Sequence, residues 1–216
     1  MKKYKIIVIG AIAVCVVFLL YTVYAKVYNK KTYGSFSIEA VIYEDADMGI
    51  SDVIEVELSK VYYCNDLMIE RNKLNDTTYQ FCLIKDKAYS GYFFALDSLY
   101  FKNKIDIYTK KGGLVYFGDS LPNYTKRIAM SDTILDKIHF KRFAINTDIE
   151  YSVFYLSERV NKLPYSFNKI AEKDYKATIQ RIDTYDRQND RFISLRLSHT
   201  DSIPKIYFNK LNSFKL

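Results

Sequence analysis

The sequence predicts a mostly β protein, in which an N-terminal transmembrane helix precedes a β-sandwich-like domain. Residues 6–24 form an apolar run without a charged side chain. Residues 38–216 contain many short stretches that are rich in strand-forming residues and are separated by turn signals, a spacing typical of all-β sandwiches. Regular helical crossovers between these stretches are missing, which disfavours a βαβ arrangement.

Composition excludes several other classes of protein. Aromatic residues make up 16% of the chain, with 21 tyrosines, whereas disordered chains are poor in aromatics. The 7 glycines and 3 prolines exclude a collagen-like or low-complexity chain. The formal net charge is +7, but acidic residues interrupt the basic ones, so we expect no nucleic-acid partner.

The apolar run at residues 6–24 is long enough to cross a membrane. Nineteen helical residues span roughly 28 Å, close to the hydrocarbon thickness of a bilayer. A basic flank, residues 1–5, precedes it, and tyrosines follow at the far end, where aromatic rings favour the membrane interface. The run therefore predicts a transmembrane helix that acts as an uncleaved signal anchor.

A cleaved signal peptide is the alternative interpretation of this run. Cleavage after Ala25 would release a secreted domain, but the apolar run exceeds the usual length of a signal peptide's core. The basic flank before the helix slightly outweighs the three lysines that follow it closely. Because basic flanks stay inside, we expect a cytoplasmic N-terminus and a domain outside.

A polar stalk, residues 25–37, leads to the β-rich extracytoplasmic domain, residues 38–216. The first predicted strand is Ser35–Glu44, and the clearest is Val53–Cys64. In the latter strand Ile54, Val56 and Leu58 alternate with polar residues. Because successive side chains in a strand point to opposite faces, these three are predicted to lie on a buried face.

Further strand candidates follow along the chain. Residues 65–76 are predicted to form a polar excursion with a helical turn at Leu67–Glu70, and Gly112-Gly113 a hairpin turn. The remaining predicted strands are Thr77–Lys85, Tyr89–Ala95, Leu99–Phe101, Ile105–Tyr108, Leu114–Phe117, Ile193–Ser198 and a closing edge strand at Ile206–Phe208.

Two segments fit either a helix or a strand. Residues 149–163 follow a capping box but also alternate as a strand, and residues 171–185 show the same conflict. The strand interpretation is preferred for both. The alternative is an α+β domain with one or two helices in the C-terminal half.

Cys64 and Cys82 form the candidate disulfide of the domain. Outside the cytosol, two cysteines at the end and the middle of neighbouring strands are candidates for a crosslink. Two buried free thiols are the alternative. Neither a redox site nor a zinc site is expected, since C-x-x-C and further ligands are missing.

Tyrosine is the candidate binding residue, because it combines an apolar ring with a polar tip and is enriched at interfaces. The candidate binding face consists of Tyr62, Tyr63, Tyr89, Tyr92 and Tyr100. The alternative is that these tyrosines pack within the sheet.

The sequence contains few signs of a catalytic, metal or cofactor site. An acidic loop at Glu44–Asp52 departs from the calcium-loop pattern, and no phosphate, dinucleotide or zinc-protease motif occurs. We therefore expect no catalytic residue, no metal and no cofactor. The sequence favours a membrane-tethered, non-catalytic binding or structural domain for an unknown protein or envelope component. The alternative is a secreted or anchored hydrolase with an unrecognised site that uses either His199, with Asp201, or the acidic loop.

Overall fold

The structure, a computed structural model, describes residues 32–44, 53–73, 75, 77–85, 88–93, 105–106, 113–114, 120–158 and 163–214. For residues 88–93 and 105–106 only the backbone is described. The chain divides into two compact units, Met1–Thr32 and Tyr33–Leu216, and the fold below is that of the second unit.

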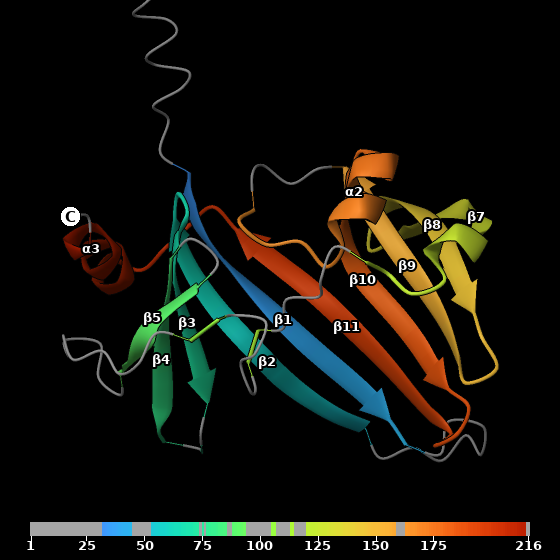
Figure 1. Ribbon diagram of the computed structural model, residues 1–216, viewed down its shortest axis with the longest axis horizontal. Helices are drawn as coiled ribbons and strands as arrows, with labels where there is room; N and C mark the ends of the chain where they lie inside the picture. The colour runs from blue at the N-terminus through green and yellow to red at the C-terminus, as the bar shows by residue number, and fades with distance from the viewer. Residues whose placement is uncertain are drawn as a thin grey trace, which may run out of the picture. The chain divides into compact units, whose positions relative to one another are not determined.

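The described strands form one antiparallel sheet of eleven strands (Figure 1). Their order is β6-β5-β4-β3-β2-β1-β11-β10-β9-β8-β7. The strands are β1 (Tyr33–Tyr43), β2 (Val53–Cys64), β3 (Leu67–Lys73), β4 (Tyr79–Lys85), β5 (Ala88–Phe93), β6 (Ile105–Asp106), β7 (Ile128–Leu135), β8 (Ile138–Asn146), β9 (Glu150–Glu158), β10 (Ala177–Asp186) and β11 (Arg191–Thr200).

The first and last strands of the chain pair at the centre of this sheet. Strand β1 lies between β2 and β11, and its pairing with β11 runs from Ser35 opposite Thr200 to Tyr43 opposite Phe192. Consecutive strands pair with each other on either side of this junction. The sheet therefore consists of two meanders joined by the pairing of β1 with β11.

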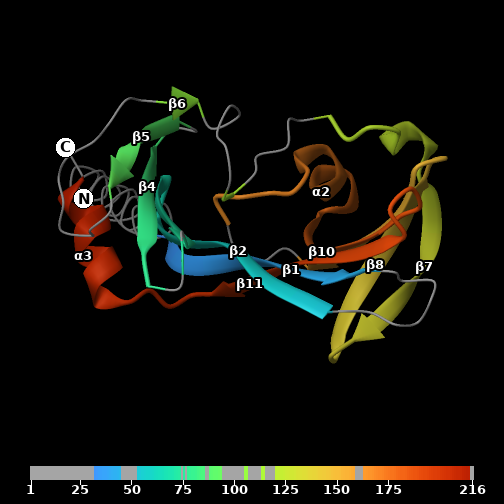
Figure 2. The same cartoon turned by 90° about the horizontal axis from the view of Figure 1, so that it is seen from below.

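The sheet is curved, and a short helix lies on each of its two faces (Figure 2). Helix α2 (Lys169–Tyr175) lies on the inner, concave face, where Ala171 packs into the larger hydrophobic cluster with Phe36 and Phe143. Helix α3 (Lys205–Ser213) covers the outer face of β2 and β3, where Leu211 packs with Tyr62 and Ile69. A 3-10 turn, Tyr124–Lys126, precedes β7.

A mostly β fold with short helices in the C-terminal half is confirmed, but the strands form one sheet rather than the two of a sandwich. Strand β9 confirms the strand interpretation of residues 149–163 over Glu150–Glu158, and residues 159–162 lie outside the described residues. Residues 171–185 divide between α2 and β10, because Lys176 adopts a left-handed conformation (φ 51°) that ends the helix.

Three further predictions were wrong. The excursion at residues 65–76 contains β3, which pairs with both β2 and β4. The predicted edge strand Ile206–Phe208 lies in α3, which begins immediately after Pro204. Strand β1 begins at Tyr33, inside the stretch predicted as a stalk, because its residues pair with β2 from that point.

The hairpin of β7 and β8 was not predicted. Its two turn residues, Asp136 and Lys137, both have positive φ angles (50° and 67°), as a type I′ turn requires.

The predicted membrane helix at residues 6–24 and the cleavage site at Ala25 lie outside the described residues. Among the helices that the structure does describe, none is long and apolar enough to cross a membrane. The predicted strand Leu99–Phe101 and most of Leu114–Phe117 also lie outside the described residues.

Candidate functional site

The aliphatic side chains of β2 share one face but are not buried. Ile54, Val56 and Leu58 are 44%, 41% and 40% exposed. Their common face was predicted from the sequence, whereas their predicted burial is wrong. Large apolar residues that lie together and remain exposed mark a contact surface for a ligand, a membrane or another protein.

Neighbouring strands extend this apolar surface. Residues directly opposite each other in an antiparallel pair point to the same face. Ile42 lies opposite both Ile54 and Ile193, and Ala40 lies opposite both Val56 and Leu195. We call the aliphatic side chains on this face the aliphatic floor: Ile38, Ala40, Ile42, Ile54, Val56, Leu58, Ile193 and Leu195. Ile38 and Ala40 are buried between their neighbours, at 4% and 3% exposure.

The aliphatic floor lies on the concave face of the sheet. Ile38 belongs to the inner cluster, in which α2 also packs, and every floor residue of β1 lies an even number of positions from it. A β-bulge shifts the register between β1 and β2, since Ile38 pairs with Ser59 but Glu39 pairs with Glu57. Leu58 is the unpaired residue of this bulge.

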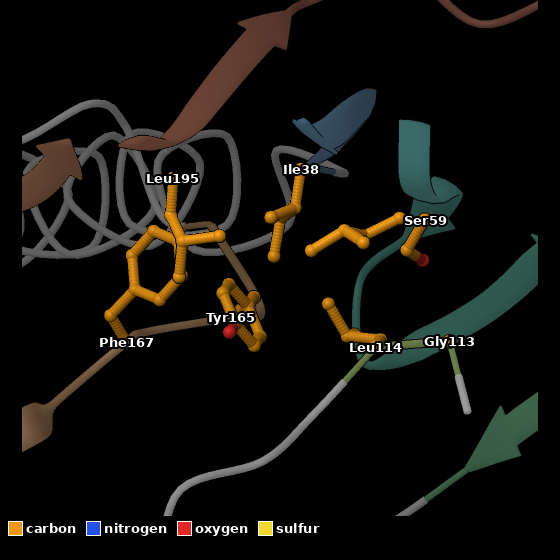
Figure 3. A pocket seen from close by; sticks show the side chains of 8 residues that line it. Ile38, Ser59, Gly113, Leu114, Tyr165, Phe167 and Leu195 are labelled. Carbon is orange, nitrogen blue, oxygen red and sulfur yellow. The ribbon is translucent and has the colours of Figure 1, made fainter. Parts of the chain in front are cut away.

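A pocket adjoins one end of the aliphatic floor (Figure 3). Its volume is about 60 Å³. Ile38, Leu58 and Leu195 belong to both the floor and the pocket, and Leu114, Tyr165 and Phe167 complete the apolar lining. Gly113 and the polar residue Ser59 also line the pocket.

Aromatic contacts hold the pocket wall in place. Tyr165 stacks on Phe36 with ring centroids 5.5 Å apart, and Phe167 packs against Tyr165 edge to face at 5.4 Å. Tyr165 is 4% exposed. Burial raises the pKa of its hydroxyl, and the nearby Glu172 and Glu70 raise this pKa further. The wall is therefore uncharged at neutral pH.

A buried carboxylate lies behind the pocket. Glu70 of β3 is 0% exposed. Its Oε1 accepts a hydrogen bond of 2.9 Å from the Ser59 hydroxyl and another from the backbone N–H of Leu114. These bonds link the floor strand β2 to the segment that carries Leu114. The pocket thus has an apolar lining, with the buried carboxyl group of Glu70 directly behind it.

The predicted disulfide between Cys64 and Cys82 does not form. Both cysteines are buried, and neither is in a disulfide. Strand β3 lies between their strands, with Cys82 opposite Glu70 and Cys64 opposite Leu67. Cys82 packs in the inner cluster and Cys64 in the outer one, so the two thiols are on opposite faces of the sheet. A disulfide requires Cβ atoms about 3.5–4.5 Å apart, which this arrangement does not permit.

The two described members of the predicted tyrosine face, Tyr62 and Tyr63, do not share a face. Tyr62 and Tyr63 are adjacent in β2, and they are buried on opposite faces, at 5% and 1% exposure. Tyr62 stacks on Tyr207 of α3 at 3.6 Å. Tyr89 and Tyr92 lie in β5 and their side chains, like the whole of Tyr100, lie outside the described residues.

His199 does not form the arrangement expected of a hydrolase. Its Nε2 lies 2.9 Å from the Tyr63 hydroxyl and 3.6 Å from a carboxylate oxygen of Asp201. The Asp201 side chain is 84% exposed. Burial lowers the pKa of His199, and Asp201 opposes this shift. Neither of these two contacts of the histidine is with a serine hydroxyl that it would activate.

Only Glu44 of the acidic loop is described, and it forms an ion pair of 2.9 Å with Arg191. Among the residues with described positions, no group of acidic, histidine and cysteine side chains is arranged to hold a metal ion.

Sequence reasoning missed the pocket residues. Leu114, Tyr165 and Phe167 come from segments without regular structure, and no periodic pattern marks them. The alternation in β2 was the available signal for the aliphatic floor.

No protein-family model and no curated protein matches this chain. Among solved structures, PNGF-II has a TM-score of 0.36 at 7% identity, over 83% of this chain and 30% of its own. This chain therefore spans about a third of the length of PNGF-II. A DUF1329-family protein from Desulfovibrio piger has a TM-score of 0.23 at 6% identity, over 86% of this chain and 93% of its own. A domain assigned to outer membrane lipoprotein sorting, from Vibrio parahaemolyticus, has a TM-score of 0.20 at 11% identity, over 88% and 94%. Overlaps at this level establish no shared function.

Proposed function

We propose that this chain is a membrane-tethered, non-catalytic binding domain on the outer side of the membrane, and that it holds the acyl chain of a membrane lipid on its aliphatic floor. The single observation that carries this proposal is the exposure of Ile54, Val56 and Leu58 on a concave sheet face that continues into an apolar pocket.

The chemistry of the aliphatic floor fits a hydrocarbon chain better than a peptide. All eight floor side chains are aliphatic. The backbone N–H and C=O groups of β1 already pair with β2 on one side and with β11 on the other. A peptide laid across this face would lose hydrogen bonds to water without finding new partners, which costs about 1–3 kcal/mol for each buried polar group. A hydrocarbon chain carries no such groups.

The predicted anchor supplies the reason for a lipid ligand. A helix at residues 6–24 would confine the domain to the membrane surface and raise its effective concentration toward lipids there. Eight residues separate this predicted helix from β1, and a fully extended chain of that length reaches about 28 Å at most.

Photolabelling of the full chain in its membrane tests the proposal. A palmitic acid that carries a diazirine within its chain is incubated with the membranes, and labelled peptides are mapped by mass spectrometry. We expect labels in residues 38–42, 54–58 and 193–195. Labels confined to residues 6–24, or to the outer-face cluster around Leu83 and Leu211, would contradict the proposal.

Loss of the floor labels on addition of a protein partner, with no loss on addition of excess unlabelled palmitic acid, would assign the surface to that partner instead. Competition by palmitic acid alone is the result expected for a lipid site.

A further inference from the structure

We propose that the pocket is an end stop for the bound chain: it receives the terminal methyl end of the acyl chain, excludes the head group, and thereby sets the chain length that the domain accepts. This inference rests on the proposed function, because it concerns the direction and length of a chain that lies on the aliphatic floor.

The aliphatic floor has one closed end and one open end. Along β1 it runs from Ile38 to Ile42, which is about 14 Å for four residues of strand. At Ile38 the floor continues into the pocket, where Tyr165 and Leu114 face it (Figure 3). Tyr165 and Leu114 are 4% and 2% exposed, so this end is a wall of packed side chains.

The apolar lining of the pocket selects the end of the ligand that enters. Ser59 is the polar residue of this lining, and it donates its hydroxyl hydrogen to the fully buried Glu70. A charged head group placed there would lose its hydration without gaining this hydrogen as a donor. A methyl group does not meet this penalty.

The opposite end of the floor carries solvated charges. Arg191 lies two residues before Ile193 in β11, at a position of the same face, and forms its ion pair with Glu44 just beyond the end of β1. Arg191 and Glu44 side chains are 39% and 35% exposed. A polar head group at this end keeps its contact with water, so the chain lies with its methyl end in the pocket.

The size of the pocket limits how far the chain enters. A cavity of about 150 Å³ accommodates benzene with its six carbons. On that scale, the 60 Å³ of this pocket accommodates the last two or three carbons of a chain. A chain that is longer than the floor and the pocket together must leave its extra carbons exposed at the open end. Its affinity is therefore lower than that of a chain that fits.

The position of the photoreactive group tests the direction of binding in the unmodified full chain. Palmitic acid with a diazirine at its terminal carbon should label residues 113–114 and 163–167. The isomer with a diazirine next to the carboxyl group should label residues 53–56 and 191–193. The reverse pattern, or the same labels from both isomers, would overturn the end-stop proposal.

Two variants test the length limit against a matched control. Leu114→Ala enlarges the pocket, while the backbone N–H of residue 114 still donates to Glu70. It should move the preferred length in a series of saturated fatty acids up by two or three carbons. Leu58→Phe, at a 40% exposed position, should move it down. Leu83→Ala removes an equally buried leucine, 4% exposed, from the outer face and should not change the preferred length.

The two proposals fail in different ways. If the chain and its variants bind fatty acids on the aliphatic floor with one unchanged length preference, the end stop is wrong and the proposed function stands. If no isomer labels the floor, both are wrong.

Discussion

Replacing Val56 by glutamate separates ligand binding from folding. Val56 is 41% exposed on the aliphatic floor, and its strand neighbours Glu55 and Glu57 point to the other face. Full burial of a valine stabilises by about 1.5–3 kcal/mol, so burial of its remaining exposed part contributes roughly 0.6–1.2 kcal/mol to binding. A carboxylate that is left unpaired against a hydrocarbon chain adds a cost of at least 1–3 kcal/mol.

The expected loss of binding free energy is therefore about 2–4 kcal/mol, or roughly 30- to 1,000-fold in affinity. The unliganded domain should change in stability by no more than about 1 kcal/mol, because the position is solvated and strand propensities span about that range.

Val53→Glu is the matched control for this substitution. Val53 is 51% exposed in the same strand, but it pairs with Tyr43 and lies on the outer face. Displacement of a fluorescent fatty acid from vesicles that contain the full chain measures the affinity, and empty vesicles give the background. We expect Val53→Glu to bind within twofold of the parent chain. Equal losses in the two variants, or no loss in Val56→Glu, would refute the aliphatic floor as the binding surface.

Three predictions concern the structure around the floor. Glu70→Ala should lower the free energy of unfolding in urea by about 2–4 kcal/mol, because the Ser59 hydroxyl and the Leu114 N–H lose their buried acceptor; a loss below about 1 kcal/mol would contradict the hydrogen-bonding role of Glu70. Burial lowers the pKa of His199, so the unfolded chain binds a proton at a higher pH than the folded one, and stability should fall as the pH drops below about 6.5. His199→Gln should reduce this pH dependence, and an unchanged slope would assign it to other groups. Cys64 and Cys82 should both react with iodoacetamide after unfolding without a reductant, and protection of the pair would show that they are crosslinked in the protein.

Local patterns in the sequence predicted where the strands lie better than they predicted which strand faces are buried. The alternation of Ile54, Val56 and Leu58 correctly predicted one shared apolar face. Whether such a face is buried depends on which other segment packs over it, and the strand's own residues do not encode this. The same limit applied to Cys64 and Cys82, because their separation depends on the insertion of β3 between their strands.

Unusual turn residues hid two other features. Lys176 ends α2 in a left-handed conformation that glycine or asparagine ordinarily adopts, so no helix stop was visible there. Asp136 and Lys137 form the turn of the β7–β8 hairpin without the Asn-Gly pair typical of it.

Tyr207 was assigned to a strand, yet it lies in α3, where its stacking on Tyr62 helps to dock that helix on the sheet.

Methyl NMR of residues 33–216, once the β content of this unit alone has been verified by circular dichroism, tests the central claim most directly. The claim is that an acyl chain lies on the aliphatic floor. On titration with a fatty acid, the methyl signals of Ile54, Val56, Leu58 and Leu195 should shift together and saturate, while those of Leu83 and Leu211 on the outer face remain unchanged. Saturable shifts confined to Leu83 and Leu211, or no saturable shift at the floor residues, would contradict the claim.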